Sequence, residues 1–346
     1  MAIERTIESE LPGGGPPASV DSRRTVAGIG PYRLAWRRLR RNRVALAFGG
    51  LFAAMVILCL LAPVYARDVA HTTPDANHIT EQVKVGGKIV EVLSPSGIPI
   101  GPTWHSRFFL GADQNGRDVA VRLLYGGRNS LFIGAVATLI TMVLAVIVGL
   151  LSGYFRGPVD GVLSRAMDVI WAYPALLLGV ALGVVLAVGG LNLGVIEIQG
   201  NSLMVPAVIV GVVYVPYVAK PLRGQILGLR EKEFIDAARA QGLGHLQIMF
   251  GEVLPNLAST IIVLVPLMLA NSILLEASLS FLGAGVQPPN PSWGTMIGDG
   301  IRFIPAAIHT TLVPGIMLML TVLGVNVLGD GVRDAFDPRA RIRVER

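Results

Sequence analysis

Residues 233–256 read EFIDAARAQGLGHLQIMFGEVLPN and form a charged island between long apolar stretches. The pattern predicts a short helix with an alanine face. Gly242 is expected to end this helix, because glycine readily adopts the positive φ angle found at helix termini. A second helix is predicted to follow and to end at Leu254-Pro255. Since apolar spans flank the island on both sides, we expect it to be a loop at a membrane surface.

The chain is too apolar for an ordinary soluble domain. Of its 346 residues, 52% are hydrophobic and only 15% are charged. A membrane-spanning helix needs roughly 17–25 apolar residues, and six charge-free runs have about this length. They are residues 44–66, 129–155, 169–196, 203–219, 257–275 and 310–329. The sequence therefore predicts an all-α polytopic membrane protein with six transmembrane helices and a helix-turn-helix loop.

Basic residues are unevenly distributed between the connecting segments. With a cytoplasmic N-terminus, 21 of the 29 Lys and Arg residues lie inside and 8 lie outside. Cytoplasmic segments of membrane proteins carry the excess of basic residues, so both termini and the loop 226–256 are predicted to be cytoplasmic. Six arginines before the first span are interpreted as a topology anchor against membrane lipid, not as a nucleic-acid site. They are Arg33, Arg37, Arg38, Arg40, Arg41 and Arg43.

These boundaries divide the chain into five segments. Residues 67–109 are predicted to be extracytoplasmic, with a small β-hairpin insert that turns at Gly86-Gly87. Residues 1–30 are rich in Gly, Pro and Ser, which predicts a disordered cytoplasmic tail. Residues 31–66 hold the basic anchor and first transmembrane helix, residues 110–332 the transmembrane core, and residues 333–346 a cytoplasmic C-terminal tail.

Two features of the outer connections lead to local predictions. Asp118 and Arg122 are four residues apart, which predicts a short amphipathic helix before the second span. Residues 287–291 contain three prolines, which favour an extended reach after the fifth span. Trp293 follows them and suits a position at the membrane–water interface.

The charged loop resembles the cytoplasmic coupling loop of ABC-importer permeases, in which Glu-Ala-Ala is followed by Gly and then by Leu-Pro. Asp236-Ala237-Ala238, Gly242 and Leu254-Pro255 occupy these positions, with Asp in place of the first Glu. Residues 110–131 and 279–294 are similar to the segments before the second span and after the fifth span in the dipeptide, oligopeptide and nickel group. The resemblance covers about residues 110–340 and the first span.

The resemblance implies a permease subunit that forms half of a translocation pathway for peptides or similar small solutes in the cell inner membrane. It implies as partners a second homologous permease, two ATPase subunits and an extracytoplasmic solute-binding protein. The chain itself is predicted to be non-catalytic, because it has no Gly-x-x-x-x-Gly-Lys-Ser/Thr phosphate-binding loop. We expect Phe234, Ile235, Ala237 and Ala238 to form a thin apolar docking face. The implied ATPase-coupling residues are Glu233, Phe234, Asp236, Ala237, Ala238, Arg239, Gly242, Leu254 and Pro255.

Carboxylates in or beside the spans are the remaining functional candidates. Asp168 and Asp330 lie near the predicted membrane edges, whereas Glu276, five residues after Asn271, lies deepest. Asn271 and Glu276 are therefore candidate pathway residues, and the alternative that Glu276 braces a neighbouring helix stays open. A proton-coupled secondary transporter would use such carboxylates as relays, but the hydropathy pattern has no inverted repeat. A membrane scaffold is a third alternative.

Cofactor and metal chemistry are not predicted. Cys59 is the only cysteine, so a disulfide within the chain and Cys metal sites are excluded. The five histidines contain no i,i+4 pair of the kind that binds zinc on a helix. The chain is thus predicted to couple transport mechanically to ATP hydrolysis on another polypeptide.

Overall fold

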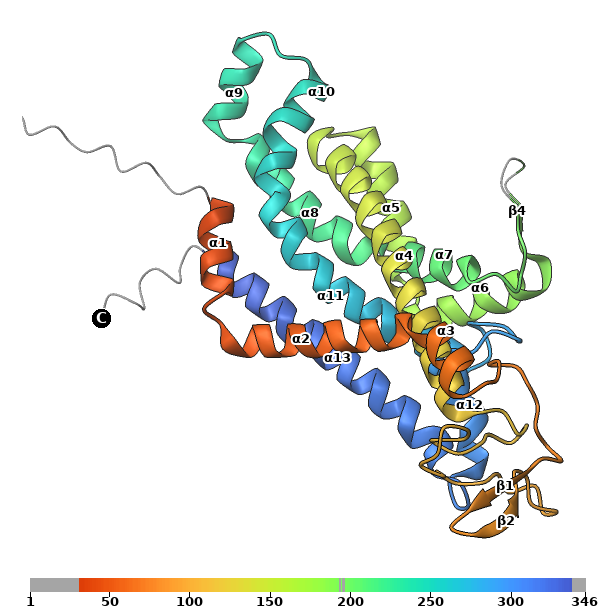
Figure 1. Cartoon of the computed structure of the whole chain (residues 1–346). Coiled ribbons are helices and arrows are strands. Elements are labelled where there is room, and N and C mark those ends of the chain that lie inside the picture. Colours follow the sequence, from red (N-terminus) through yellow and green to blue (C-terminus); the bar gives the residue numbers. More distant parts are fainter. Residues whose placement is uncertain (1–30, 193, 195–196, 338–346) are drawn as a thin grey trace, which may run out of the picture.

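The computed structural model describes residues 31–192, 194 and 197–337 of the chain. This part is mostly helical, with two short pairs of strands (Figure 1). The predicted tail 1–30 lies outside the described residues. The elements are α1 (Pro31–Leu39), α2 (Arg43–Leu60), α3 (Ala62–Val64), a π-helical turn (Tyr65–Val69), β1 (Gln82–Val85), β2 (Lys88–Glu91), α4 (Val119–Tyr154), α5 (Pro158–Trp171), α6 (Ala175–Gly189), β3 (Leu191–Asn192), β4 (Glu197–Ile198), α7 (Met204–Val213), α8 (Val215–Arg230), α9 (Glu233–Ala240), α10 (His245–Ile248), a π-helical turn (Met249–Val253), α11 (Leu254–Phe281), α12 (Trp293–Gly300), a 3₁₀ turn (Ile301–Phe303) and α13 (His309–Phe336).

Within the described residues, five helical segments are long and apolar enough to cross a membrane, and one bent helix pair adds a sixth. The longest single helix, α4, has 36 residues. At about 1.5 Å per residue it spans about 54 Å, well beyond the roughly 30 Å of bilayer hydrocarbon. The prediction of an all-α polytopic membrane protein is confirmed. The five segments are Arg43–Leu60, Val119–Tyr154, Met204–Arg230, His245–Phe281 and His309–Phe336.

The third predicted span, residues 169–196, is not one straight helix. α5 and α6 meet at an angle of 88° across residues 172–174. Pro174 explains the bend, because proline has no N–H to donate and disfavours helical geometry in the residue before it. The helix also ends before the apolar run does. α6 ends at Gly189, and β3 then pairs antiparallel with β4.

α4 begins further upstream than the predicted second span, and no separate amphipathic helix precedes it. Asp118 is its N-cap, and its carboxylate accepts hydrogen bonds from the backbone N–H groups of Ala120 (2.8 Å) and Val121 (3.1 Å). Arg122 does not pair with Asp118. Its guanidinium lies 3.5 Å from a carboxylate oxygen of Asp113 and donates to the carbonyl of Pro74 at 3.0 Å.

The predicted hairpin is present at the opposite end of the molecule from α9 and α10 (Figure 1). β1 and β2 pair antiparallel with Val85 opposite Lys88. Gly86 and Gly87 form the turn with φ angles of +58° and +84°, which suit glycine at both positions. The hairpin is anchored through Val92, which is buried with Phe108 in a small apolar cluster.

Trp293 lies in the protein interior, so its predicted interfacial position is wrong. The side chain is fully buried, and its indole Nε1 donates to the carbonyl of Leu123 at 3.1 Å. The ring packs against Gly127, where an added Cβ would come within 2.5 Å of the indole. The proline-rich segment thus brings the chain back onto α4 instead of leaving the tryptophan at the surface.

The C-terminal helix extends past residue 333, where the sequence analysis placed the start of a tail. α13 continues to Phe336, and residues 338–346 lie outside the described part. Arg38 on α1 donates to the carbonyls of Ala335 (3.4 Å) and Asp337 (3.0 Å). A cation at these carbonyls stabilises a helix C-terminus, so α1 is held against the end of α13.

Candidate functional site

α9 and α10 project from one end of the helical bundle (Figure 1). α9 ends in a Schellman motif: the N–H of Gly242 donates to the carbonyl of Arg239 at 2.9 Å, and that of Leu243 donates to the carbonyl of Ala238 at 3.2 Å. Gly242 has φ +81°, so the conformation predicted for it is present. The glycine reverses the chain and starts α10 close to α9.

The inner face of α9 belongs to the protein core. Ile235 is fully buried and Ala238 is 5% exposed, and both join the largest apolar cluster with Ile226 and Ile248. The expectation that Ile235 and Ala238 belong to an exposed docking face is therefore wrong. A helix of eight residues is marginal alone, and these two side chains supply the packing that orders it.

The outer face of α9 carries the other predicted coupling residues on this helix. Phe234 is 37% exposed, and beside it lie exposed Ala237 and the charged side chains. Asp236 and Arg239 form an exposed ion pair at 3.0 Å, and Glu233 is exposed in the first turn. The result is a surface with a small apolar centre and charges at its margin.

α10 and the π-helical turn carry two further exposed apolar side chains that were not predicted from the sequence. Leu246 is 65% exposed and Phe250 is 59% exposed, although both are large apolar side chains. The sequence shows more apolar residues in this stretch than one helix face can bury. Ile248, Met249 and Val253 join the core, and Leu246 and Phe250 do not. We call Glu233, Phe234, Ala237, Leu246 and Phe250 the outer coupling surface.

The coupling surface is tied directly to two long helices. The hydroxyl of Tyr154, at the end of α4, lies 3.1 Å from Nδ1 of His245. Arg230, at the end of α8, donates to the carbonyl of Tyr154 at 2.7 Å. Because Tyr154 is buried and its ring also packs edge-on against His245, these contacts join α10 to the ends of α4 and α8.

Ion pairs hold α5 against α8 at the same end. Arg223 contacts Asp160 through two hydrogen bonds, each of 2.7 Å. Lys220 lies 2.7 Å from Asp168 and 3.9 Å from the centroid of the Trp171 ring. Asp168, one of the carboxylates considered for a proton relay, is therefore engaged in a structural pair.

Leu254 and Pro255 do not end the second helix of the loop. α10 continues through a π-helical turn into α11, and Pro255 sits in the first turn of α11. Proline is tolerated there because the first N–H groups of a helix have no partner within it. The loop is thus joined to the fifth span by an unbroken helical path, with a π-turn of the type often found at functional sites.

Asn271 and Glu276 occupy different environments. Glu276 is fully buried, and one carboxylate oxygen accepts from the Ser280 hydroxyl at 2.7 Å while the other has no partner among the described residues. Asn271 is half-buried, and its backbone carbonyl accepts from the Tyr214 hydroxyl at 3.4 Å. Of the two interpretations of Glu276, the bracing of neighbouring elements fits an enclosed side chain better than lining a pathway.

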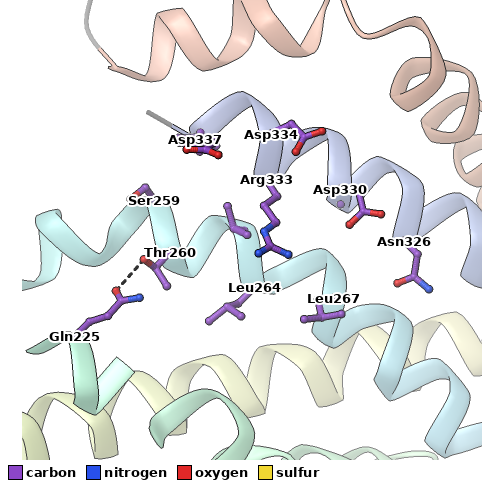
Figure 2. Close-up of a pocket in the computed structure, with 13 residues that line it drawn as sticks. Gln225, Ser259, Thr260, Leu264, Leu267, Asn326, Asp330, Arg333, Asp334 and Asp337 are labelled. Atoms are coloured by element: carbon purple, nitrogen blue, oxygen red, sulfur yellow. Dashed lines mark hydrogen bonds between the residues drawn. The ribbon is translucent and has the colours of Figure 1, made fainter. Parts of the chain in front are cut away.

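A groove with many polar side chains opens between α8, α11 and α13 (Figure 2). Its volume is about 640 Å³. Its lining combines apolar side chains of α11 with polar side chains from all three helices. Of the residues that line it, only Asp330 was a functional candidate from the sequence. The groove is lined by Gln225, Ser259, Thr260, Val263, Leu264, Leu267, Asn326, Gly329, Asp330, Arg333, Asp334, Phe336 and Asp337.

Two protein families match this chain. Residues 145–342 match the binding-protein-dependent transport system inner membrane component family. Residues 30–82 match the N-terminal transmembrane domain of oligopeptide transport permease C. The first match contains the α9–α10 loop and all three helices of the groove.

Individual proteins are similar along most of their length. A dipeptide transport system permease protein of Alkalihalophilus pseudofirmus is 33% identical over 313 residues, covering 90% of this chain and 91% of that protein. A glutathione transport system permease protein of Salmonella typhimurium is 35% identical over 311 residues, with 90% and 91% covered. Among solved structures, the MetNI methionine ABC transporter in an inward-facing conformation has a similar fold, with a TM-score of 0.50, 19% identity, and coverage of 62% of this chain and 96% of that one.

Proposed function

Because this chain belongs to the binding-protein-dependent transport system inner membrane component family, we propose that it is the permease subunit of an ATP-driven importer and that its outer coupling surface docks on an ATPase. The observation that carries this proposal is the exposure of Phe234, Leu246 and Phe250 on a loop anchored to the spans. Large apolar side chains that gather at one surface mark an interaction site.

The coupling mechanism follows from the contacts of this loop. ATP binding on the partner displaces the docked helices, and the Tyr154–His245 and Arg230–Tyr154 contacts carry the displacement into α4 and α8. The helical path through the π-turn carries it into α11. The subunit performs no hydrolysis itself, and its part in transport is to change the relative positions of the spans.

The assembly contains a second homologous permease, two ATPase subunits and an extracytoplasmic solute-binding protein. The cargo is a peptide or similar small solute, which is supported by the dipeptide and glutathione permeases that resemble the chain over nine-tenths of its length. A proton-driven carrier is disfavoured, because Asp168 is held by Lys220 and Glu276 is enclosed.

The first prediction concerns the energy source. The full chain purified alone in lipid nanodiscs should not hydrolyse ATP, whereas co-expression with ATPase subunits of an importer from the same organism should give a stable complex that does. The measurements are co-purification on a tag carried by this chain and phosphate release. A chain that hydrolyses ATP after removal of all other proteins would contradict the proposal, as would failure to retain any ATPase subunit.

The second prediction concerns orientation. We propose that the α9–α10 end and both termini are cytoplasmic and that the β1–β2 hairpin is outside, as the basic residues indicate. Cysteines introduced at Ile89 (72% exposed) and Leu246 (65% exposed) report on the two ends. A membrane-impermeant maleimide should label only Ile89→Cys in intact cells and both variants after permeabilisation. The unsubstituted chain is the blank, because Cys59 is fully buried, and labelling of Leu246→Cys in intact cells would reverse the topology.

A further inference from the structure

The exposed face of α13 changes character along its length. Towards the hairpin end it is apolar, with exposed Leu312, Ile316, Met319 and Leu323. Asn326, Asp330 and Arg333 continue the same face at i, i+4 and i+7. Figure 2 shows Asp330 and Arg333 extending from α13 towards α11, into the polar groove.

Three of the charged side chains that line this groove have no partner within the described part of the chain. The side chains of Asp330, Arg333 and Asp334 form no ion pair or hydrogen bond with residues 31–192, 194 or 197–337. On α8 and α11, in contrast, two lining side chains bond to each other: the Thr260 hydroxyl donates a hydrogen bond to the Gln225 side-chain oxygen at 2.9 Å. Unpaired ions are costly beside lipid, and these three are exposed and lie at or beyond the predicted membrane edge, where water reaches them. The groove is therefore suited to water or a polar solute.

The chemistry of the lining points to one class of solute. Asp330 and Asp334 can accept hydrogen bonds from an ammonium group, and Arg333 between them can donate two to a carboxylate. Val263, Leu264 and Leu267 also line the groove and can contact an apolar side chain. A volume of about 640 Å³ falls in the range of roughly 300–1,000 Å³ that is typical of small-molecule sites.

We propose that the α8–α11–α13 groove is the water-filled inner mouth of the translocation path and that it contacts zwitterionic solutes, with their ammonium group at Asp330 and Asp334 and their carboxylate at Arg333. This inference rests on the proposed function, and it adds the charge class of the solute and the residues that meet it. The groove serves passage and not tight capture, because its charges are exposed to water and screened.

Cysteine accessibility tests the groove in the assembled transporter, using inside-out membrane vesicles. Asn326→Cys should react with a cationic methanethiosulfonate about tenfold faster than with an anionic one, after correction for their reactivity with free cysteine, because the flanking carboxylates concentrate cations. The double variant Asp330→Asn/Asp334→Asn should remove most of this preference. Leu139→Cys is the control, since Leu139 is 64% exposed in the middle of α4, where we expect lipid, and neither reagent should reach it.

Solute protection tests the charge class. Millimolar alanyl-alanine should slow labelling of Asn326→Cys at least twofold, whereas N-acetyl-alanyl-alanine amide, which has neither terminal charge, should not. An unreactive Asn326→Cys would overturn the proposal by showing that a partner subunit or lipid fills the groove, and equal or absent protection by the two peptides would overturn the zwitterion assignment. ATPase retention, measured on the same preparations, reports separately on the proposed function, so a failure of either proposal is distinguishable.

Discussion

Ala237→Trp should abolish solute uptake while the protein remains folded and inserted. Ala237 is exposed on the outer face of α9, between Phe234 and the charged margin of the coupling surface. An indole there cannot clash with this chain, but it would separate a closely docked partner. A misfit of about 2–4 kcal/mol at an interface corresponds to a loss of binding of roughly 30-fold or more. We therefore expect a comparable fall in uptake and in ATPase co-purification.

Two further tryptophan variants give this prediction its controls. Ala166→Trp places the same bulk at an exposed alanine of α5, outside the coupling surface, and should leave uptake near normal. Ala238→Trp should instead lower the amount of folded protein, because Ala238 is 5% exposed inside the core cluster. Normal transport by Ala237→Trp would contradict docking on this face. Lost transport with full ATPase retention and unchanged stimulation of hydrolysis would place the defect in the pathway instead.

Among alanine substitutions of the four native tryptophans, Trp293→Ala should produce the largest loss of stability. The ring is fully buried against Gly127, and its N–H donates to the Leu123 carbonyl. Truncation of a buried Trp costs about 3–5 kcal/mol through lost burial and the cavity left behind. We expect the Tm of the detergent-solubilised chain to fall on the order of 5–10 °C. Static light scattering during heating measures this, because its signal depends neither on tryptophan fluorescence nor on a free thiol.

Trp104→Ala is the matched control for this change, because Trp104 is 68% exposed and touches Phe109 edge-on. Its effect should stay within about 0.5 kcal/mol, as for most surface substitutions. Trp293→Phe should fall between the two, since it keeps most of the packing and loses the hydrogen bond to Leu123. Similar Tm values for Trp293→Ala and Trp104→Ala would show that the ring does not anchor the segment after the fifth span.

Much of the architecture could be predicted because its signals are local. An apolar run of sufficient length specifies a spanning helix wherever it lies in the chain, and the Gly86-Gly87 pair specifies the turn of β1–β2 through its φ angles. Gly242 is a similar case, because the reversal after α9 needs a positive φ that glycine adopts without strain. The bend at Pro174 carried an equally local signal, which the continuous apolar run concealed.

The candidate site was predicted less completely, because the sequence of a short amphipathic helix does not tell which side chains pack in the protein core and which meet a partner. The residues in the coupling pattern fall on both sides of α9: Ala237 is exposed, and Ala238 is in the core. Which side faces inward depends on α8 and on the π-turn, whose apolar side chains surround Ile235. Pro255 could not be placed from the sequence for a similar reason, because proline is compatible both with a helix end and with the first turn of a new helix.

By itself, the sequence determined that this protein has six apolar runs long enough for membrane-spanning helices, that its charged loop reverses at Gly242, and that the chain has no phosphate-binding loop of its own. These properties depend on the composition of contiguous residues. Only the tertiary structure decided that Trp293 is buried, that Phe234, Leu246 and Phe250 are exposed while Ile235 is in the core, and that Gln225, Thr260 and Arg333 line one groove. Burial and cavities are made by side chains that meet across distant helices, and the packing of those helices is specified by the whole set of contacts and not by any one segment.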